Sequence, residues 1–335
     1  MNIFDSPIIF IHYGNSDYLQ YTIKCAILHN PNKKIILLGD SQNEKLANKF
    51  PTLYFRHFKD FENDTKIEKF NSKFQFIAGA NHGKPYWVNF VFKRWLIVNN
   101  FIKIHSIKSL WIFDSDNLIL NSLSKIEHRF LNYDATEQCN HMCLNGFISN
   151  IEVIEKYTDT IINLFDRKEL LDSYRKEFET NTNYAFTEMR AYEIFKKEHN
   201  YNILTLNTIF ENSTFDECLC QNHEMKMIKS DKYKYVHKEL YTDKFGNFYT
   251  KKLISNEFVH LHSINLSWLP LIAYKNILKQ ASKKLLFKKN DPFQTEIYLF
   301  NLLYSNFIEL FIGFFFNNIF IIKEKLSGTI QKNKI

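Results

Sequence analysis

Two carboxylates follow an apolar run near the middle of the chain. Residues 110–113, Leu-Trp-Ile-Phe, are short, aromatic and β-branched, which predicts a buried strand. Asp114 and Asp116 come next, with Ser115 between them. Residues two apart in an extended segment point to the same side, so we expect both carboxylates to converge at the carboxyl edge of a sheet, where open α/β sheets bind ligands. Like charges repel unless a cation lies between them, and Mg²⁺ or Mn²⁺ prefers such oxygen ligands.

The alternative for the same residues is a strand followed by an Asx turn, with Asp114 capping the turn. The neighbouring elements bear on the choice between a metal site and an Asx turn. Residues 8–11 and 35–38 predict buried strands, and residues 18–30 between them have helical spacing. Right-handed crossovers make such a unit parallel, and no Gly-x-Gly-x-x-Gly fingerprint of a dinucleotide site is present.

The rest of the chain continues the alternation of strands and helices. We predict an α/β fold with a mixed, mostly parallel sheet flanked by helices. Residues 59–76 lack a clear period and are expected to be a loop. Further strands are predicted at 53–55, 203–206 and 258–263, and helices at 44–50, 87–101, 151–178 (one helix or a pair) and 187–195.

Composition limits the class of protein. The 335 residues suffice for one large α/β domain with an appendage, and 45% hydrophobic with 24% charged residues is typical of a globular chain. The net charge of +7 favours acidic partners, which include nucleotide diphosphates, anionic lipid surfaces and nucleic acid, without choosing among them.

The cysteines indicate a reducing compartment. Their number is odd, and the N-terminus has no basic region before an apolar core, so it is not a secretory signal. The spacings do not match a standard zinc knuckle, so ordinary free thiols are favoured over a zinc site. The five are Cys25, Cys139, Cys143, Cys218 and Cys220.

The Asp-x-Asp after a buried strand resembles the motif of GT-A fold glycosyltransferases, the nucleotide-diphospho-sugar transferase superfamily. The resemblance covers about residues 7–270 and implies that Asp114 and Asp116 hold Mn²⁺ or Mg²⁺ on the donor diphosphate. It also implies that His12 and Tyr13, in the loop after the first strand, contact the base and ribose, and that Arg94 faces the donor phosphates. The alternatives are ordinary loop residues and a solvated helix face.

Two later segments extend the resemblance. Asn145-Gly146 is by itself a hairpin signal, and it also looks like the small-residue loop that these enzymes place beside the donor sugar, although Phe147 replaces the second small residue. Glu188 follows Thr187 at a predicted helix start, where the helix dipole favours a carboxylate. The resemblance implies a catalytic or sugar-contacting acid at Glu188. An N-terminal helix residue with no catalytic role is the alternative.

A late histidine completes the resemblance. His260 and His262 alternate in a predicted strand that leads to Trp268, and several metal-dependent families end their domain with a His that completes the metal shell. We expect His262 to be that ligand, although the Gly and Lys of the family pattern are missing. Two strand histidines with ordinary hydrogen bonds are the alternative.

The C-terminal segment changes character, and we predict a domain at 1–275 and a helical appendage at 276–335. Lysines cluster before Asp291, and residues 297–322 carry one charge, Glu309. The length would span a bilayer, but four asparagines dilute it, so a helix lying on an anionic membrane surface is favoured. A helix packed on the domain or on a second copy is the alternative.

Together these features predict a metal-dependent glycosyltransferase. It would move a sugar from a nucleotide-diphosphate donor to a glycan or lipid-linked glycan acceptor, in surface polysaccharide synthesis. No nucleic-acid partner is expected, and the location would be cytoplasmic, at the inner face of the membrane. Two alternatives stay open. One is a catalytically silent sugar- or nucleotide-binding protein of the same fold, and the other is a nucleotidyltransferase, whose usual Gly-rich basic loop is absent.

Overall fold

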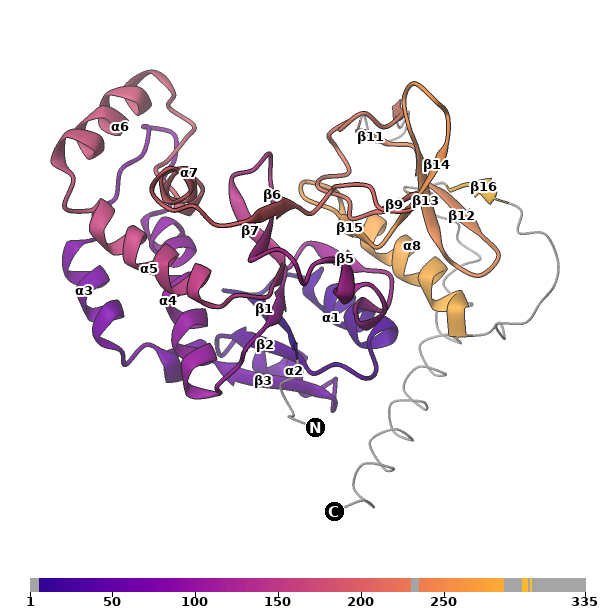
Figure 1. The fold of residues 1–335 in the computed structure, drawn as a ribbon, viewed down its shortest axis with the longest axis horizontal. Coiled ribbons are helices and arrows are strands. Elements are labelled where there is room, and N and C mark those ends of the chain that lie inside the picture. Colours follow the sequence, from indigo (N-terminus) through magenta and orange to yellow (C-terminus); the bar gives the residue numbers. More distant parts are fainter. Residues whose placement is uncertain (1–5, 230–234, 286–296, 301, 303–335) are drawn as a thin grey trace, which may run out of the picture.

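A seven-stranded mixed sheet lies at the centre of the molecule (Figure 1). The computed structural model describes residues 6–229, 235–285, 297–300 and 302. In spatial order the strands are β3 (Leu53–His57), β2 (Ile35–Gly39), β1 (Ile8–Ile11), β4 (Leu110–Ile112), β7 (Cys143–Ile148), β6 (Ala135–Gln138) and β8 (Ile203–Thr205). The pairs that β7 makes with β4 and β6 are antiparallel, and the other four are parallel. The predicted α/β class with a mostly parallel sheet is therefore confirmed.

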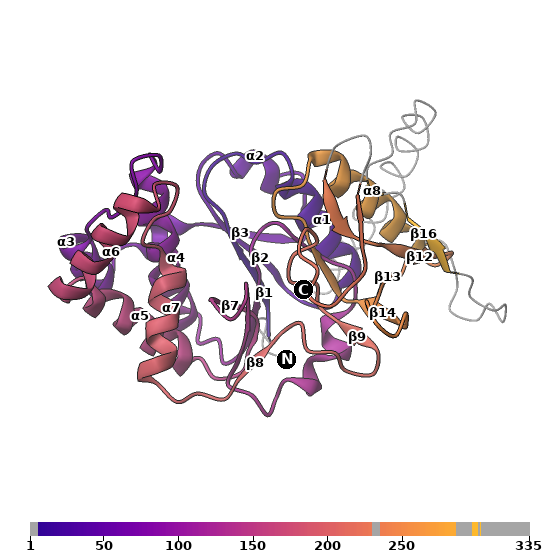
Figure 2. The same cartoon turned by 90° about the horizontal axis from the view of Figure 1, so that it is seen from above.

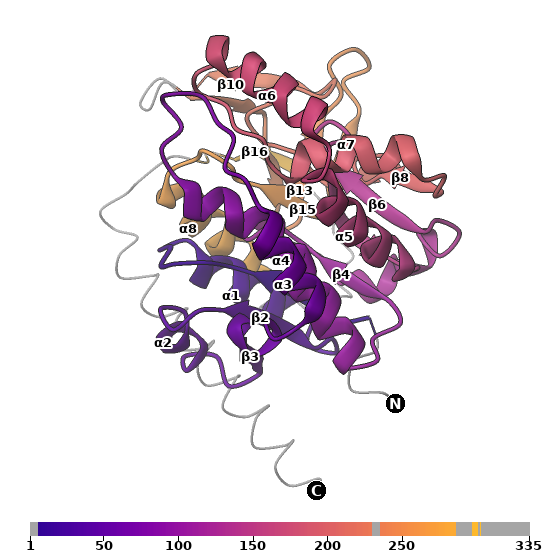
Figure 3. The same cartoon turned by 90° about the vertical axis from the view of Figure 1, so that its left-hand side faces the viewer.

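Helices cover both faces of this sheet because strand residues alternate between the faces. Ile9 and Ile11 of β1 pack in one buried cluster with α3, α4, α5 and α7, whereas Ile8 and Phe10 join a second cluster with α1 and α2. Figure 2 shows the two helical layers on opposite sides of the sheet, and Figure 3 looks onto the first layer. The helices are α1 (Leu19–His29), α2 (Glu44–Ala47), α3 (Thr65–Lys73), α4 (Pro85–Ile104), α5 (Glu152–Leu164), α6 (Lys168–Thr180), α7 (Glu188–Glu198) and α8 (Leu271–Ala281).

A second sheet is formed by the later part of the chain. In spatial order it contains β16 (Ile297–Leu299), β12 (Tyr241–Asp243), β13 (Phe248–Lys251), β14 (Phe258–Leu261) and β9 (Ser213–Thr214). Two strand pairs accompany it, β10 (Met227–Lys229) with β11 (Val236–Lys238), and β5 (Asn117–Ile119) with β15 (Ser263–Asn265). Since β5 begins directly after Asp116, the antiparallel β5–β15 pair ties this later part to the predicted site.

Residues 59–76 are not the predicted loop. They contain the 3₁₀ turn η1 (Phe58–Phe61) and the helix α3. Asp64 caps α3, since its side chain accepts a hydrogen bond of 2.8 Å from the backbone N–H of Lys66. Ile67 and Phe70, three residues apart, are buried in the cluster with α4 and α5. The apolar spacing is therefore helical, but it is too short to stand out among the surrounding polar residues.

The structure also bears on the predicted helix at 151–178 and on the predicted domain boundary at 275/276. The predicted helix at 151–178 is the pair α5 and α6. Helix α8 runs across the predicted domain boundary at 275/276 and packs on α1, where the rings of Tyr18 and Tyr274 stack at 5.0 Å. The remaining 3₁₀ turns are η2 (Leu123–Lys125), η3 (Glu127–Arg129) and η4 (Ser282–Leu285).

The predicted membrane-binding tail falls almost entirely outside the described residues, which include only 297–300 and 302 of the apolar segment. Within the described part of the chain, no helix combines the length and the apolar character needed to cross a membrane.

Candidate functional site

The Asp-x-Asp segment forms a tight turn at the carboxyl end of β4. The backbone N–H of Asn117 donates to the carbonyl of Asp114 at 3.1 Å, so the four residues 114–117 reverse the chain into β5. This differs from the extended segment assumed for the sequence, in which the two carboxylates would share a side by alternation. The side chain of Asp114 is 33% exposed. The turn lies beside β1, whose parallel pairing with β4 places both strand ends at one edge of the sheet.

Arg94 joins two of the predicted site residues. Its Nη1 donates to Asp114 Oδ1 at 2.6 Å and its Nη2 to Glu188 Oε1 at 3.1 Å. Burial alone would lower the pKa of Arg94, but the charges of Asp114 and Glu188 outweigh it and raise that pKa, so the guanidinium stays charged. These two bonds use two of the five N–H donors of the guanidinium, and Nε donates to no acceptor among the described residues, so donor capacity remains beside the two carboxylates. The structure thus brings Arg94, Asp114 and Glu188 together.

Glu188 is the first residue of α7 and is almost fully buried, with 8% of its side chain exposed. Thr187 occupies the N-cap position, but its side chain makes no capping hydrogen bond. The hydroxyl of Tyr157 on α5 donates to the Glu188 carbonyl at 2.6 Å, which fixes the helix start. Burial raises the pKa of the Glu188 carboxyl, and Arg94 opposes this rise. The second oxygen, Oε2, accepts no hydrogen bond from the described residues.

Asp116 lies on the other side of the turn and contacts a different part of the chain. Its Oδ2 accepts a hydrogen bond of 2.6 Å from the hydroxyl of Ser267, just after β15. Burial, together with the nearby charge of Asp114, raises the pKa of Asp116 to about 6. The two carboxylates are therefore close enough for their charges to repel, although a turn and not an extended strand brings them together.

Ser115, between the two carboxylates, fixes the turn to the first βα unit. Its hydroxyl lies 2.9 Å from His12 Nδ1 and 3.2 Å from the Tyr18 hydroxyl, and its carbonyl accepts from Thr22 Oγ1 at 2.6 Å. His12 is buried, and burial lowers its pKa to about 4, so the imidazole is neutral at physiological pH. The structure therefore places His12 behind the Asp-x-Asp turn.

Tyr13, unlike the adjacent His12, packs against α4. Its ring is 44% exposed and packs 5.3 Å from Phe90 and 6.0 Å from Tyr86, both on α4. Tyr86 is also exposed. The exposed rings form an aromatic surface at the mouth of the β1–α1 loop, suited to stacking against a planar ring.

Asn145 and Gly146 are not in a hairpin turn. They lie inside β7, where Ile112 of β4 pairs with Gly146, and the hairpin turn falls at residues 139–142 instead. Gly146 has φ +95°, and a Cβ there would collide with the side chains of Thr136 and Leu206, so the Asn-Gly pair serves a close strand contact. Asn145 is buried and lines a cavity of about 10 Å³ together with Arg94 and Asp114, which is space for one water.

The structure does not bring His262 together with Asp114 and Asp116. His262 lies between β14 and β15, and its carbonyl accepts from the N–H of Leu120. The antiparallel register then pairs Ser263 with Ile119 and Asn265 with Asn117, so His262 lies at the far end of β5, roughly 13 Å from Asp116 at about 3.3 Å per residue. The ring of His260 is 5.3 Å from that of His262.

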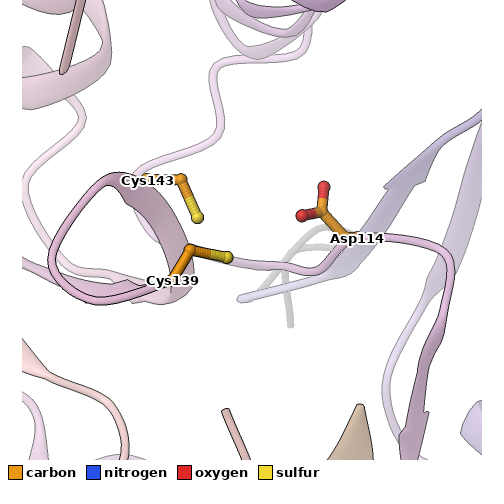
Figure 4. Close-up of side chains that lie close together, drawn as sticks. All are labelled: Asp114, Cys139 and Cys143. Atoms are coloured by element: carbon orange, nitrogen blue, oxygen red, sulfur yellow. The ribbon is translucent and has the colours of Figure 1, made fainter. Parts of the chain in front are cut away.

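Two cysteines lie beside Asp114 instead. A carboxylate oxygen of Asp114 and the Sγ atoms of Cys139 and Cys143 are all within 4.8 Å of one another (Figure 4). The neighbouring Cys139 thiol and burial raise the pKa of Cys143 well above its usual range. The five cysteines form no disulfide.

A cavity of about 720 Å³ lies between the second sheet and the segment 214–225. Its wall contains the buried ion pair Lys238–Asp216, with Nζ and Oδ1 2.5 Å apart, and Glu217, which is 3.5 Å from His223 Nε2. Phe215 and Leu261 supply an apolar part of the wall. Glu217 also accepts a hydrogen bond from the backbone N–H of Asn140, in the turn that carries Cys139. The cavity and the carboxylate turn are thus neighbours.

A hard divalent cation fits the chemistry of the Asp114–Asp116 pair. A carboxylate offers about four lone-pair sites, so Asp114 bound to Arg94 and Asp116 bound to Ser267 each keep acceptor capacity. Burial first, and then the charge of Asp114, raise the pKa of Asp116, and a cation bound between the two carboxylates would favour their ionised forms.

The sequence interpretation missed Ser267, Tyr18, Thr22 and the two cysteines as neighbours of the turn. The only sequence signal for Ser267 is its place in the Ser-Trp pair after the predicted strand at 258–263.

Comparison with known proteins gives distant structural matches only. No family model and no curated protein matches the sequence. Mouse xyloside xylosyltransferase 1 aligns with 62% of this chain and 87% of its own, at 12% identity and a TM-score of 0.38. A variant of LgtC aligns with 60% of this chain and 72% of its own, at 13% identity and a TM-score of 0.35. The bifunctional glycosyltransferase WbbM aligns with 61% of this chain and 39% of its own, at 11% identity and a TM-score of 0.35. Because these scores are low, the assignments below rest on the residues of this chain.

Proposed function

We propose that this protein is a metal-dependent glycosyltransferase that moves a sugar from a nucleotide-diphosphate donor to a glycan or lipid-linked glycan. The observation that carries the proposal is the cluster at one sheet edge, where Arg94 links Asp114 to Glu188 and Asp116 lies across the same turn. Carboxylates at the carboxyl ends of parallel strands are the expected place and chemistry for a cation with a diphosphate.

The donor would lie along the loop after β1. Asp114 and Asp116 would hold Mn²⁺ or Mg²⁺, which as a Lewis acid would neutralise the departing diphosphate. Tyr13 would stack on the nucleotide base, because its ring is exposed and supported by Phe90. His12 would act through Ser115, holding the turn in position as a neutral imidazole. Asn145 and Gly146 of β7 would border the sugar, since Asn145 shares a small cavity with Asp114.

Glu188 would act on the sugar or on the acceptor hydroxyl. Its Oε2 has no partner among the described residues, while Arg94 holds Oε1 in a fixed direction. A buried carboxyl with a raised pKa is better matched to proton transfer near neutral pH than an exposed one. In this proposal Arg94 orients both carboxylates and turns its remaining N–H donors toward the donor phosphates.

The acceptor would enter the cavity of about 720 Å³. Its wall combines carboxylates with an aromatic ring, and carbohydrate hydroxyls bind such polar groups while sugar faces pack on rings. The neighbouring turn at residues 139–142 would bring the acceptor toward Asp114. We also propose that the C-terminal segment contacts an anionic membrane surface. A cytoplasmic location and a role in surface polysaccharide synthesis complete the proposal. All three concern matters outside the described residues.

One observation favours the alternative of a silent sugar- or nucleotide-binding protein. Glu188 is 8% exposed and ion-paired, which also suits a residue that only stabilises the start of α7. Turnover separates the two functions, because a binding protein would retain donor affinity without releasing the nucleotide.

The test is release of nucleoside diphosphate from a panel of nucleotide-sugars with Mn²⁺. Asp114→Ala and Asp116→Ala should each lower turnover by at least about 100-fold, and Glu188→Gln should lower kcat by about 100- to 10,000-fold with donor affinity nearly unchanged. Asp172→Asn, on the exposed face of α6, is the matched control and should be fully active. Full activity in both aspartate variants would contradict the metal role. Donor binding without turnover by the unmodified protein would favour the silent alternative.

A further inference from the structure

Three side chains that could bind a soft metal meet beside the Asp-x-Asp turn. The antiparallel register of β4 with β7 pairs Ile112 with Gly146, and its continuation brings the start of β7 alongside Asp114. Cys143 is the first residue of β7, and Cys139 lies at the other end of the same short turn. Figure 4 shows the Cys139 thiol directed toward the Asp114 carboxylate and the Cys143 thiol directed toward the Cys139 thiol. One ligand atom from each of the three residues lies within 4.8 Å of the other two.

We propose that Asp114, Cys139 and Cys143 form a binding site for a thiophilic divalent cation, of which Zn²⁺ is the type. Zinc bonds of about 2.3 Å to sulfur and about 2.0–2.2 Å to oxygen place tetrahedral ligand atoms about 3.5–3.8 Å apart. The observed separations, within 4.8 Å, therefore need to contract by about 1.3 Å at most, a change that side-chain rotation at Cys139 on the turn can supply. Three protein ligands leave a fourth position for water or for a ligand.

Charge and burial both suit this ion. Two thiolates and one carboxylate with Zn²⁺ carry a net charge of −1, and the guanidinium of Arg94, bonded to Asp114, balances it. Hydrogen bonds of this kind to a ligating carboxylate orient it from outside the coordination shell. Cys143 is 3% exposed, which keeps water from one side of the site, whereas the partly exposed Cys139 offers an entry path.

Other nearby donors are already engaged elsewhere. His141, in the same turn, directs Nδ1 to Glu137 and Thr205 at 2.8 and 3.0 Å. Cys218 and Cys220 form no comparable group with acidic or histidine side chains in the part of the chain that the structure describes. They therefore provide a matched control, since they are a cysteine pair of the same protein outside the proposed site.

Co²⁺ is the probe, because its thiolate complexes have a charge-transfer absorption in the near ultraviolet. The full-length protein, reduced and free of oxygen, should show this band saturating at one Co²⁺ per chain, and added Zn²⁺ should remove it whereas Mn²⁺ should not. Cys139→Ser and Cys143→Ser should lose affinity by more than the about 10- to 100-fold typical of a lost outer contact, while the Cys218→Ser/Cys220→Ser variant should keep the band. Circular dichroism checks the fold, and the partly exposed Cys139 keeps the test decisive if Cys143→Ser fails to fold.

A reduced protein that shows no thiolate band at equimolar Co²⁺ would overturn the proposal, as would a band that persists in Cys139→Ser. Asp116→Ala separates this proposal from the proposed function, because it should keep the cobalt band while losing donor turnover. A consequence for activity rests on the proposed function. Since Zn²⁺ would take Asp114 from the donor metal, Zn²⁺ should inhibit the Mn²⁺-supported reaction. In Cys139→Ser, measured against that variant's own Mn²⁺-supported rate, this inhibition should require a higher Zn²⁺ concentration.

Discussion

Replacing Arg94 with Met should expose how the buried carboxylates depend on it. The substitution keeps the side-chain length and removes the charge that Asp114 and Glu188 share. Glu188, 8% exposed, cannot remain ionised without a partner and should take up a proton. Neutralising a carboxyl with an unfolded pKa of about 4.3 at about pH 7 costs about 1.36 × 2.7, or about 3.7 kcal/mol, which limits the penalty from this residue. Burial already raises the pKa of Glu188 when Arg94 is present, so the loss in the free energy of unfolding should stay below this limit of about 3.7 kcal/mol, and the more exposed Asp114 should add little.

The stability deficit of Arg94→Met should depend on pH. Burial raises the folded pKa of Glu188 above its unfolded value, so the folded state binds the extra proton and the penalty is present above the unfolded pKa. Removing Arg94 raises the folded pKa further, so the deficit of the variant should shrink to about 1 kcal/mol or less at about pH 5. Denaturant unfolding of both proteins at the two pH values measures this difference.

Two variants control the result. Arg190→Met removes ion pairs to Glu177 and Glu193 that are about one third exposed, and should cost less than about 1 kcal/mol. Adding Glu188→Gln to Arg94→Met should recover much of the lost stability by removing the unpaired charge. If Arg94→Met is no worse than Arg190→Met, or if its deficit is the same at both pH values, the ion pair does not carry the charge balance described above.

Two further predictions concern the strand contact and the buried imidazole. Gly146→Ala should lower the free energy of unfolding by about 1–3 kcal/mol or more, because φ is +95° and the added Cβ would meet Thr136. Gly83→Ala, with open space around the added Cβ, should change it by less than about 0.5 kcal/mol. Equal denaturation midpoints for the two variants would contradict the close contact. His12, whose pKa burial lowers to about 4, binds a proton in the unfolded chain first, so stability should fall as pH drops from about 6.5 toward 4, by up to about 1.36 kcal/mol per pH unit. His12→Gln should flatten that slope in unfolding experiments across this range, and an unchanged slope would show that His12 does not titrate as described.

The elements that the sequence predicted well are those whose signal is local. Strands such as β1 and β4 are continuous apolar runs, and their parallel order follows from the handedness of crossovers. The sequence alone was therefore enough to predict that Asp114 follows a buried strand. The grouping of Arg94 and Glu188 with Asp114 came only from the family resemblance, since the residues lie 20 and 94 positions apart in the hydrogen bonds that join them.

What the sequence could not provide depends on pairing between distant segments. Asn145-Gly146 has the composition of a turn, but Gly146 is needed for a close contact with Thr136 and Leu206, which no local pattern reveals. His262 alternates correctly with His260, yet the register of β15 on β5 decides which residue comes near Asp116, and that residue is Ser267. The neighbouring cysteines depend on the same kind of information, because β7 returns antiparallel to β4.

The turn at residues 139–142 has a consequence of its own. Cys139, Asn140 and His141 all have positive φ, between 53° and 66°, which costs roughly 1 kcal/mol for each non-glycine residue. One side of this turn contacts Asp114 through Cys139, and the other contacts the large cavity through Asn140, whose Oδ1 is 3.3 Å from His223 Nε2. A single strained turn thus separates the side-chain group at Asp114 from the large cavity, the two regions proposed above to bind ligands. A ligand that shifts the turn from one side changes the affinity on the other, and reciprocity requires the second ligand to change the first affinity by the same factor.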